Sequence, residues 1–384
     1  MGNLPGPLAS VNAASAALLV VLLVVLLATF GCAANVVVPR EAESEVREYL
    51  GSSTRGPAVL ERVDSAPATV WRTNAGRGST GAPAVGDRVM AVATVDRWVY
   101  ALDTRTGRVY WRYRGDAPYG SGPVMTQGRV IAASEGRDGK LTAITVATGK
   151  RRWQANVGDV GSPIAAGDST VYGATQQGVA FAYRIDNGRQ VWRRVVGPTR
   201  SGPLMLGRHA VYATLTDTLV ILDAGTGANV ARTRLPVSTV APLARLDDST
   251  ALLTSPSGRV VAAAVPSGRV RWEVDTREPV YGSPVVTQDT VYALTNRCTL
   301  WTIPVAAPSR AVTASIGCVS EAAPAVVRGG VLVATVRGEV IYYDRSARRT
   351  VWTRTLRGEL RQPPTVRNGQ ILVAPILGPV VSFR

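Results

Sequence analysis

The chain has 384 residues, 46% of them hydrophobic, and carries a formal net charge of +16. This content is sufficient for one large all-β domain or two ordinary domains. Three cysteines and one histidine nearly exclude a Cys/His metal cluster. Any nucleophile assisted by histidine would have to use His209, which we interpret as a turn residue before a strand. The positive charge, almost all arginine, favours attraction to anionic lipid, acidic polymer or acidic protein, weakened by salt.

The first segment, residues 1–31, is predicted to be a signal peptide or a membrane anchor. The run "AASAALLVVLLVVLLATFGC" is uncharged and apolar, and it ends at Cys32. Three interpretations stay open: a lipoprotein signal with Cys32 as the lipidation site, an uncleaved anchor long enough to span a bilayer at ~1.5 Å per residue, and a cleaved signal. Gly31 before Cys32 fits a lipobox, whereas Phe30 fits it poorly.

Residues 32–67 are polar, mixed in charge and interrupted by Gly, Ser and Pro. No alternating apolar pattern marks a strand in this segment. We therefore predict a flexible tether between the N-terminal segment and a folded domain over residues 68–384.

Residues 68–384 contain eight repeats of about forty residues. A small residue followed by proline opens an apolar strand in each, at intervals of 39 to 42 residues; these prolines are Pro83, Pro123, Pro163, Pro203, Pro242, Pro284, Pro324 and Pro363. The second repeat reads as four short strands, "GPVMTQ", "RVIAAS", "KLTAITV" and "RRWQANV". Four strands per forty residues are typical of a propeller blade. The sequence therefore predicts an all-β fold, an eight-bladed β-propeller of four-stranded antiparallel blades.

The hairpin between the third and fourth strands carries a second pattern, first seen in "YALDTRTGRVYW". Its turn glycine supplies a positive φ and recurs as Gly107, Gly149, Gly188, Gly227 and Gly268. Tryptophan follows four residues later in most repeats. The tryptophans that recur at the repeat spacing, here called the grid, are Trp71, Trp111, Trp153, Trp192, Trp272 and Trp352. We predict that these residues form a structural clamp in which each Trp packs against the neighbouring blade and its N–H finds a backbone acceptor.

Trp71 precedes the first proline marker, and the last repeat has only three strands. The segment around Trp71 should therefore supply the fourth strand of the last blade. Closing the ring with strands from both ends of the domain removes an open sheet edge.

The pattern lapses in three repeats. The fourth has Ala231 in place of Trp, the seventh has Arg348 in place of Gly, and the sixth lacks both residues but contains Cys298 and Cys318. Antiparallel pairing of its last two strands brings these cysteines within reach of each other. We predict a disulfide that replaces the missing clamp, contributes roughly 3 kcal/mol and requires an oxidising compartment.

The grid Ala-x-Asp-x-x-Thr-Gly-x-x-x-Trp, complete from Ala101 to Trp111, resembles the repeat of the pyrroloquinoline-quinone (PQQ)-type β-propellers. That family includes quinone-dependent dehydrogenases and non-catalytic lipoproteins such as the propeller subunit of the outer-membrane β-barrel assembly machinery. A ring behind an N-terminal lipid tether is similar in layout to the latter. The resemblance implies a membrane-tethered, extracytoplasmic scaffold, periplasmic or on the cell surface, whose partners are other envelope proteins.

The dehydrogenase branch implies a pair of adjacent cysteines, a calcium site and long inserted loops, which the regular repeats do not contain. Carboxylates lie mostly in turns between the first two strands; they are Asp87, Asp168, Asp247, Asp248 and Asp289. We interpret them as solvated turn residues, and predict no catalytic, cofactor-binding or metal-binding residues, no small-molecule substrate and no nucleic-acid partner. The alternatives are a PQQ-dependent oxidoreductase and a binder of anionic envelope lipid or polymer.

Overall fold

The computed structural model describes residues 2, 38, 46–47, 59–62, 66–79 and 81–384, and the chain divides into two units, Met1–Val37 and Val38–Arg384. Apart from Gly2, the predicted signal or anchor of residues 1–31 lies outside the described residues, as does Cys32. Within the described part, no helix has the length and apolar character needed to cross a bilayer.

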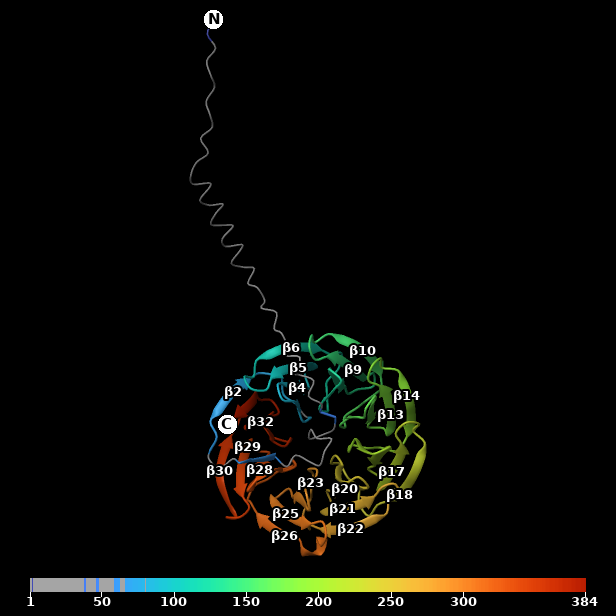
Figure 1. The fold of residues 1–384 in the computed structure, drawn as a ribbon, viewed down its shortest axis with the longest axis vertical. Coiled ribbons are helices and arrows are strands. Elements are labelled where there is room, and N and C mark those ends of the chain that lie inside the picture. The colour runs from blue at the N-terminus through green and yellow to red at the C-terminus, as the bar shows by residue number, and fades with distance from the viewer. Residues whose placement is uncertain (1, 3–37, 39–45, 48–58, 63–65, 80) are drawn as a thin grey trace. The chain divides into compact units, whose positions relative to one another are not determined.

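The predicted eight-bladed β-propeller is confirmed. Eight antiparallel sheets stand around a central axis, and the chain passes from blade to blade around the ring (Figure 1). Within a blade each strand pairs with the next strand in sequence, except that β2 completes blade 8 and β1 adds to blade 7. Turns between the first and second strands, and between the third and fourth, therefore share one face of the ring, here called the hairpin face. Turns between the second and third strands share the opposite face, here called the loop face, with the connections between blades.

Blades 1 to 4 follow one another from residue 84 to residue 234. Blade 1 consists of β3 (Ala84–Val85), β4 (Val89–Ala93), β5 (Trp98–Asp103) and β6 (Val109–Arg114). Blade 2 consists of β7 (Val124–Thr126), β8 (Arg129–Ala133), β9 (Lys140–Thr145) and β10 (Arg151–Asn156). Blade 3 consists of β11 (Ala165–Ala166), β12 (Thr170–Ala174), β13 (Val179–Arg184) and β14 (Gln190–Val195). Blade 4 consists of β15 (Pro203–Leu206), β16 (His209–Ala213), β17 (Thr218–Asp223) and β18 (Asn229–Arg234).

Blades 5 to 8 complete the circle. Blade 5 consists of β19 (Ala244–Asp247), β20 (Thr250–Ser255), β21 (Arg259–Ala264) and β22 (Val270–Asp275). Blade 6 consists of β23 (Val285–Thr287), β24 (Thr290–Leu294), β25 (Thr299–Pro304), the 3₁₀ turn η2 (Pro308–Arg310) and β26 (Val312–Ser315). Blade 7 contains β27 (Ala325–Arg328), β28 (Gly330–Ala334), β29 (Glu339–Asp344) and β30 (Arg349–Thr355). Blade 8 consists of β31 (Thr365–Arg367), β32 (Gln370–Val373), β33 (Val380–Phe383) and β2 (Thr69–Thr73).

The core lies between the blades, where neighbouring sheets pack face to face. Second strands such as β4 are buried on both faces, which explains why they read as continuous apolar runs. Fourth strands such as β18 alternate exposed and half-buried residues, and they carry many of the arginines on the outer rim.

The small residues beside the proline markers lie where backbones of neighbouring blades meet. A Cβ built on Gly122 would lie 2.0 Å from the carbonyl oxygen of Ala82 in the preceding blade. A Cβ on Gly81 would lie 1.8 Å from the amide nitrogen of Gly122. Only glycine allows this approach at positions 81 and 122, which agrees with the crowding expected near the axis.

Ring closure by the N-terminal strand of the domain is also confirmed. β2 pairs antiparallel with β33, and Trp71 lies opposite Ser382. The amide of Ala68 donates to Arg384 O at 2.8 Å, and the amide of Arg384 donates to Ala68 O at 2.9 Å. An ion pair of 2.6 Å between Arg367 of blade 8 and Asp87 of blade 1 crosses the adjoining seam.

The segment predicted as a tether, residues 32–67, differs from expectation where it is described. β1 (Val59–Arg62) pairs in parallel with β27 and gives blade 7 a fifth strand, at its innermost edge. Val46 forms an antiparallel bridge with Met125 of β7. Inner strands present unpaired backbone groups toward the axis, so a short extended segment can add to them without an alternating apolar pattern of its own.

Candidate functional site

The structure joins the predicted clamp residues across blade boundaries. Trp111 Nε1 of blade 1 donates to Val146 O of blade 2 at 2.5 Å. The indole ring covers the turn of that blade so closely that a Cβ on Gly149 would lie 2.7 Å from it. The same donation to the next blade recurs from Trp71 to Thr104 O, from Trp153 to Ile185 O and from Trp192 to Ala224 O.

In the regular blades the Trp lies opposite an alanine on the third strand. These pairs are Ala101–Trp111, Ala143–Trp153, Ala182–Trp192 and Ala262–Trp272. Where the grid lapses, the large and small residues are exchanged. Blade 4 pairs Ile221 with Ala231, and blade 6 pairs Trp301 with Thr313.

Trp352 and Arg348 in blade 7 show two further departures from the clamp. Trp352 is buried, and its Nε1 has no hydrogen-bond partner among the described residues. The next blade takes its fourth strand from the other end of the domain, so it has no turn there that could offer a carbonyl. Arg348, in the place of the turn glycine, has a φ of 52° and donates from Nη2 to Thr313 O of blade 6 at 3.0 Å.

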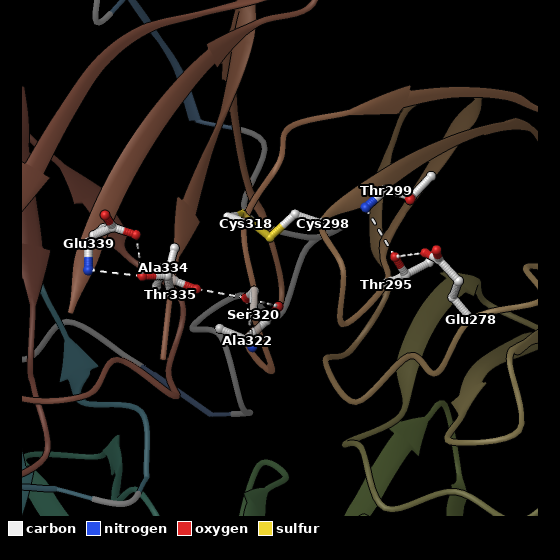
Figure 2. Close-up of a disulfide and its surroundings, with 10 residues drawn as sticks. All are labelled: Glu278, Thr295, Cys298, Thr299, Cys318, Ser320, Ala322, Ala334, Thr335 and Glu339. Atoms are coloured by element: carbon white, nitrogen blue, oxygen red, sulfur yellow. Dashed lines mark hydrogen bonds between the residues drawn. A yellow bond between two sulfur atoms is a disulfide. The ribbon is translucent and has the colours of Figure 1, made fainter. Parts of the chain in front are cut away.

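Cys298 and Cys318 are joined by a disulfide with a Cα–Cα distance of 5.2 Å (Figure 2). Cys298 is fully buried in the turn before β25, and Cys318 follows β26, so the bond lies within blade 6. Both positions are on the loop face, whereas the Trp contacts join blades near the hairpin face. The disulfide therefore does not occupy the place of the missing clamp, where Arg348 of blade 7 bonds to Thr313 O of blade 6 instead.

Thr295 and Ser320, close to the disulfide, are bonded to neighbouring loops and strands. Thr295 Oγ1 bonds to Glu278 Oε2 at 2.5 Å and accepts from the amide of Thr299 at 3.0 Å (Figure 2). Ser320 Oγ donates to Ala334 O in blade 7 at 2.7 Å. These bonds fix the two loops that the disulfide links.

The Asp103 carboxylate stabilises the turn of the hairpin in which it lies. Asp103 accepts from the amides of Arg105 and Thr106 and from Tyr110 Oη, at 2.9, 3.0 and 2.5 Å. Burial alone would raise the pKa of Asp103, but these hydrogen bonds outweigh it and lower the pKa. Burial, together with the bond to Asp103, raises the pKa of Tyr110 to about 12.

The carboxylates between first and second strands also have local partners. Asp247 accepts from Ser249 and Thr250, Asp248 lies 3.9 Å from Arg245, and Asp289 accepts from Thr290 at 3.1 Å. His209 begins β16 and is half-buried. No three His, Cys, Asp or Glu side chains of the described residues group as metal ligands.

Asp168 takes part in a cluster that the sequence did not predict. Arg47 Nη1 lies 2.6 Å from Asp168 Oδ1, beside a cavity of about 430 Å³ that Tyr172, Met205 and Arg245 also line. Arg47 belongs to the segment predicted as a tether and reaches blade 3 from inside the ring. The valines and the mixed charge of that segment were the only sequence signals of such a contact. They were not recognised, because the segment lacks the alternating apolar pattern of a strand.

Comparison with known proteins identifies the repeats. A family model described as "Outer membrane protein assembly factor BamB" matches residues 58–215, 215–307 and 296–381. An outer membrane protein assembly factor BamB from Bordetella pertussis is 28% identical over 165 residues, which are 40% of this chain and 39% of that protein. A 1-butanol dehydrogenase (cytochrome c) from Thauera butanivorans is 37% identical over 91 residues, 21% of this chain and 13% of that protein.

The crystal structure of BamB from Moraxella catarrhalis superposes with a TM-score of 0.69 at 17% identity, and covers 83% of this chain and 100% of that one. This likeness shows the fold. The alignment with the curated relative from Bordetella pertussis spans about two fifths of that relative's length. The family model, in contrast, extends over nearly all the repeats. The chain therefore belongs to the family described as outer membrane protein assembly factor BamB.

Proposed function

We propose that this protein is a membrane-tethered, extracytoplasmic propeller that acts as a protein-interaction scaffold in the cell envelope and is not an enzyme. The observation that carries the proposal is the match of the assembly-factor family from residue 58 to residue 381. The disulfide between Cys298 and Cys318 supports an oxidising compartment outside the cytoplasm. Partners would be other envelope proteins.

Exposed large apolar side chains of the described residues lie on two surfaces, seven on outer fourth strands and four in loops, and the four in loops support docking on the loop face. Among the described residues, exposed large apolar side chains outside strands are Leu215, Tyr281, Val319 and Leu377. Leu215 and Leu377 are in turns between second and third strands, and Tyr281 and Val319 are in connections between blades. All four therefore belong to the loop face. Apolar side chains rimmed by polar residues are typical of surfaces that bind proteins.

Crosslinking in native membranes, followed by mass spectrometry, tests the scaffold and its face together. The double substitution Leu215→Glu and Leu377→Glu should remove most of the envelope proteins captured by the unaltered chain. The matched control is Val195→Glu, on the outer strand β14, where the exposed fraction of 76% compares with 69% for Leu377. Equal capture by all three proteins would refute docking on the loop face.

Anchoring is proposed through the N-terminal segment, with Cys32 as the lipidation site. The support is the uncharged apolar run that ends at Gly31–Cys32. Cys32→Ser should release the protein from the membrane fraction, and mass spectrometry should find a lipid on Cys32 in the unaltered chain. Membrane association of the Cys32→Ser protein would instead support an uncleaved span, and release of an unlipidated native chain would support ordinary cleavage.

A quinone-dependent oxidoreductase is the second candidate, and the similarity to the dehydrogenase from Thauera butanivorans supports it. Calorimetric titration of the purified protein with PQQ and Ca²⁺ separates the two functions, because a scaffold should give no saturable heat. A binder of anionic lipid or polymer is the third, supported by the charge of +16. It requires cosedimentation with anionic vesicles that decreases as salt increases.

A further inference from the structure

The innermost strands of the blades line the axis of the ring with backbone groups that no neighbouring strand of the same blade can satisfy. In blades 2, 3 and 7 these groups bond to residues that precede the propeller repeats in the sequence. The residues concerned are Val46, Arg47 and β1, here called the strap residues.

The contacts with blades 2 and 3 use both backbone and side chains. The amide of Val46 donates to Met125 O at 2.6 Å, and the amide of Met125 donates to Val46 O at 2.9 Å. The amide of Ala166 in β11 donates to Arg47 O at 2.7 Å. Val46 is only 4% exposed and packs in the apolar cluster that contains Ala84 and Met125. Arg47 adds an ion pair with Asp168; the Arg47 side chain is 24% exposed, whereas the Asp168 carboxylate is 96% exposed, so the pair adds less than the backbone bonds.

The third contact lies across the ring. β1 pairs with β27 of blade 7, with Val59 opposite Val327 and Arg62 opposite Arg328. Blades 3 and 7 are four apart in a ring of eight and are therefore opposite one another. Arg47 and Val59 are twelve positions apart in the sequence, so one short stretch of chain contacts opposite sides of the axis.

Blade 4 satisfies the same kind of group in another way. Met205 pairs with Ala210 as Met125 pairs with Val130, so the two methionines have the same register in their blades. Met205 O accepts from Arg245 Nη2 of blade 5 at 2.5 Å, whereas Met125 O accepts from the backbone of Val46. Among the described residues, the inner edges of blades 2, 3 and 7 receive an added peptide, whereas Met205 O of blade 4 receives a side chain of the next blade.

We propose that the inner edges of blades 2, 3 and 7 form a binding site for an extended peptide, and that the strap residues are its resident occupant. Backbone hydrogen bonds to a sheet edge supply affinity, and side-chain sites supply selectivity. The apolar cluster around Val46 and the carboxylate of Asp168 select an apolar residue followed by a basic one. A partner with this pattern has to displace the strap residues before it can bind.

Hydrogen–deuterium exchange of the full chain tests this site. Val46→Pro removes the amide that donates to Met125 O, and Arg47→Asp opposes Asp168 without changing the backbone. Val46→Pro should speed the exchange of peptides covering β7 and β11 by about fivefold to tenfold, the change expected from the loss of a hydrogen bond. Arg47→Asp should speed it by only about twofold to fivefold, because the Asp168 carboxylate is exposed to solvent. Exchange of β15, which contains Met205, should not change. Arg208→Ala is the matched control, since it removes a 2.9 Å ion pair with Asp223 within blade 4.

A peptide added in trans completes the test. A synthetic peptide with the sequence of residues 40–52 should restore slow exchange of β7 and β11 in the Val46→Pro protein. The same peptide with Asp and Glu in place of Val46 and Arg47 should not restore it. Unchanged exchange in both strap variants would overturn the resident strap, and failure of the unaltered peptide to restore protection would overturn the peptide site.

Discussion

The turn glycine beneath each tryptophan is the residue on which the blade contacts depend most directly. Gly149 has a φ of 67°, and Trp111 occupies the space that a side chain would need. Gly207 has a comparable φ of 55° but nothing within 4 Å of an added Cβ. The two glycines therefore separate the cost of backbone conformation from the cost of a clash.

Gly149→Ala should lower the free energy of unfolding by about 2–4 kcal/mol, because left-handed strain and overpacking add together. Gly207→Ala should lower it by only about 1–2 kcal/mol, from strain alone. Urea denaturation of both variants measures the difference. Equal losses would show that the indole does not press on the turn.

Tryptophans that look equivalent in the sequence differ in their hydrogen bonds. Trp153 Nε1 donates to Ile185 O at 2.8 Å, whereas Trp352 Nε1 is buried without a partner among the described residues. Trp153→Phe should therefore cost about 1–3 kcal/mol more than Trp352→Phe, since only the first leaves a buried carbonyl unpaired. Thermal or urea denaturation of the two variants checks this order, and a larger loss from Trp352→Phe would contradict it.

Among the elements, the hairpin between the third and fourth strands recurs in most blades, and the sixth repeat departs from it most. Its disulfide ties the start of β25 to the residues after β26 and closes a loop with a sequence separation of 20. Replacement of Cys298 and Cys318 by alanine should lower the free energy of unfolding by roughly 3 kcal/mol. Reduction of the unaltered protein should give the same loss, measured by urea denaturation. If reduction lowered the free energy of unfolding but the double alanine variant did not, the disulfide would not be the source of the stability.

The hairpin grid also shows how far sequence reasoning extends. Spacing of proline, glycine and tryptophan predicted the repeats, the strands and the ring closure, because these residues meet local steric demands. The exchange of large and small residues in blades 4 and 6 escaped prediction. Trp301 and Thr313 lie opposite each other on two paired strands. A residue pattern taken from one strand does not show how side-chain volumes compensate between paired strands.

The strap residues were missed for a different reason. Val46 and Arg47 add to the inner edges of blades through backbone hydrogen bonds, which impose little pattern on the side chains. Asp168 was predicted to be a solvated turn residue, and its side chain is 96% exposed, but its partner Arg47, 121 positions earlier in the sequence, was not predicted. Contacts of this kind depend on the closed ring, which brings distant segments to one axis.

The propeller is a closed ring whose blades are joined by indole contacts and by a seam of strands from both ends of the domain, and its loop face carries exposed apolar side chains. A closed ring holds that face in one geometry, which suits a surface on which other proteins assemble. We propose that partner proteins dock on this loop face.

Site-specific photocrosslinking in native membranes tests that claim most directly. A photoreactive amino acid would replace either Leu377 on the loop face or Val195 on the outer strand β14, two positions with similar exposure. Crosslinks to the same few envelope proteins from position 377, with none from position 195, are the predicted result. Crosslinks from position 195 alone, or from neither position, would contradict a scaffold that docks its partners on the loop face.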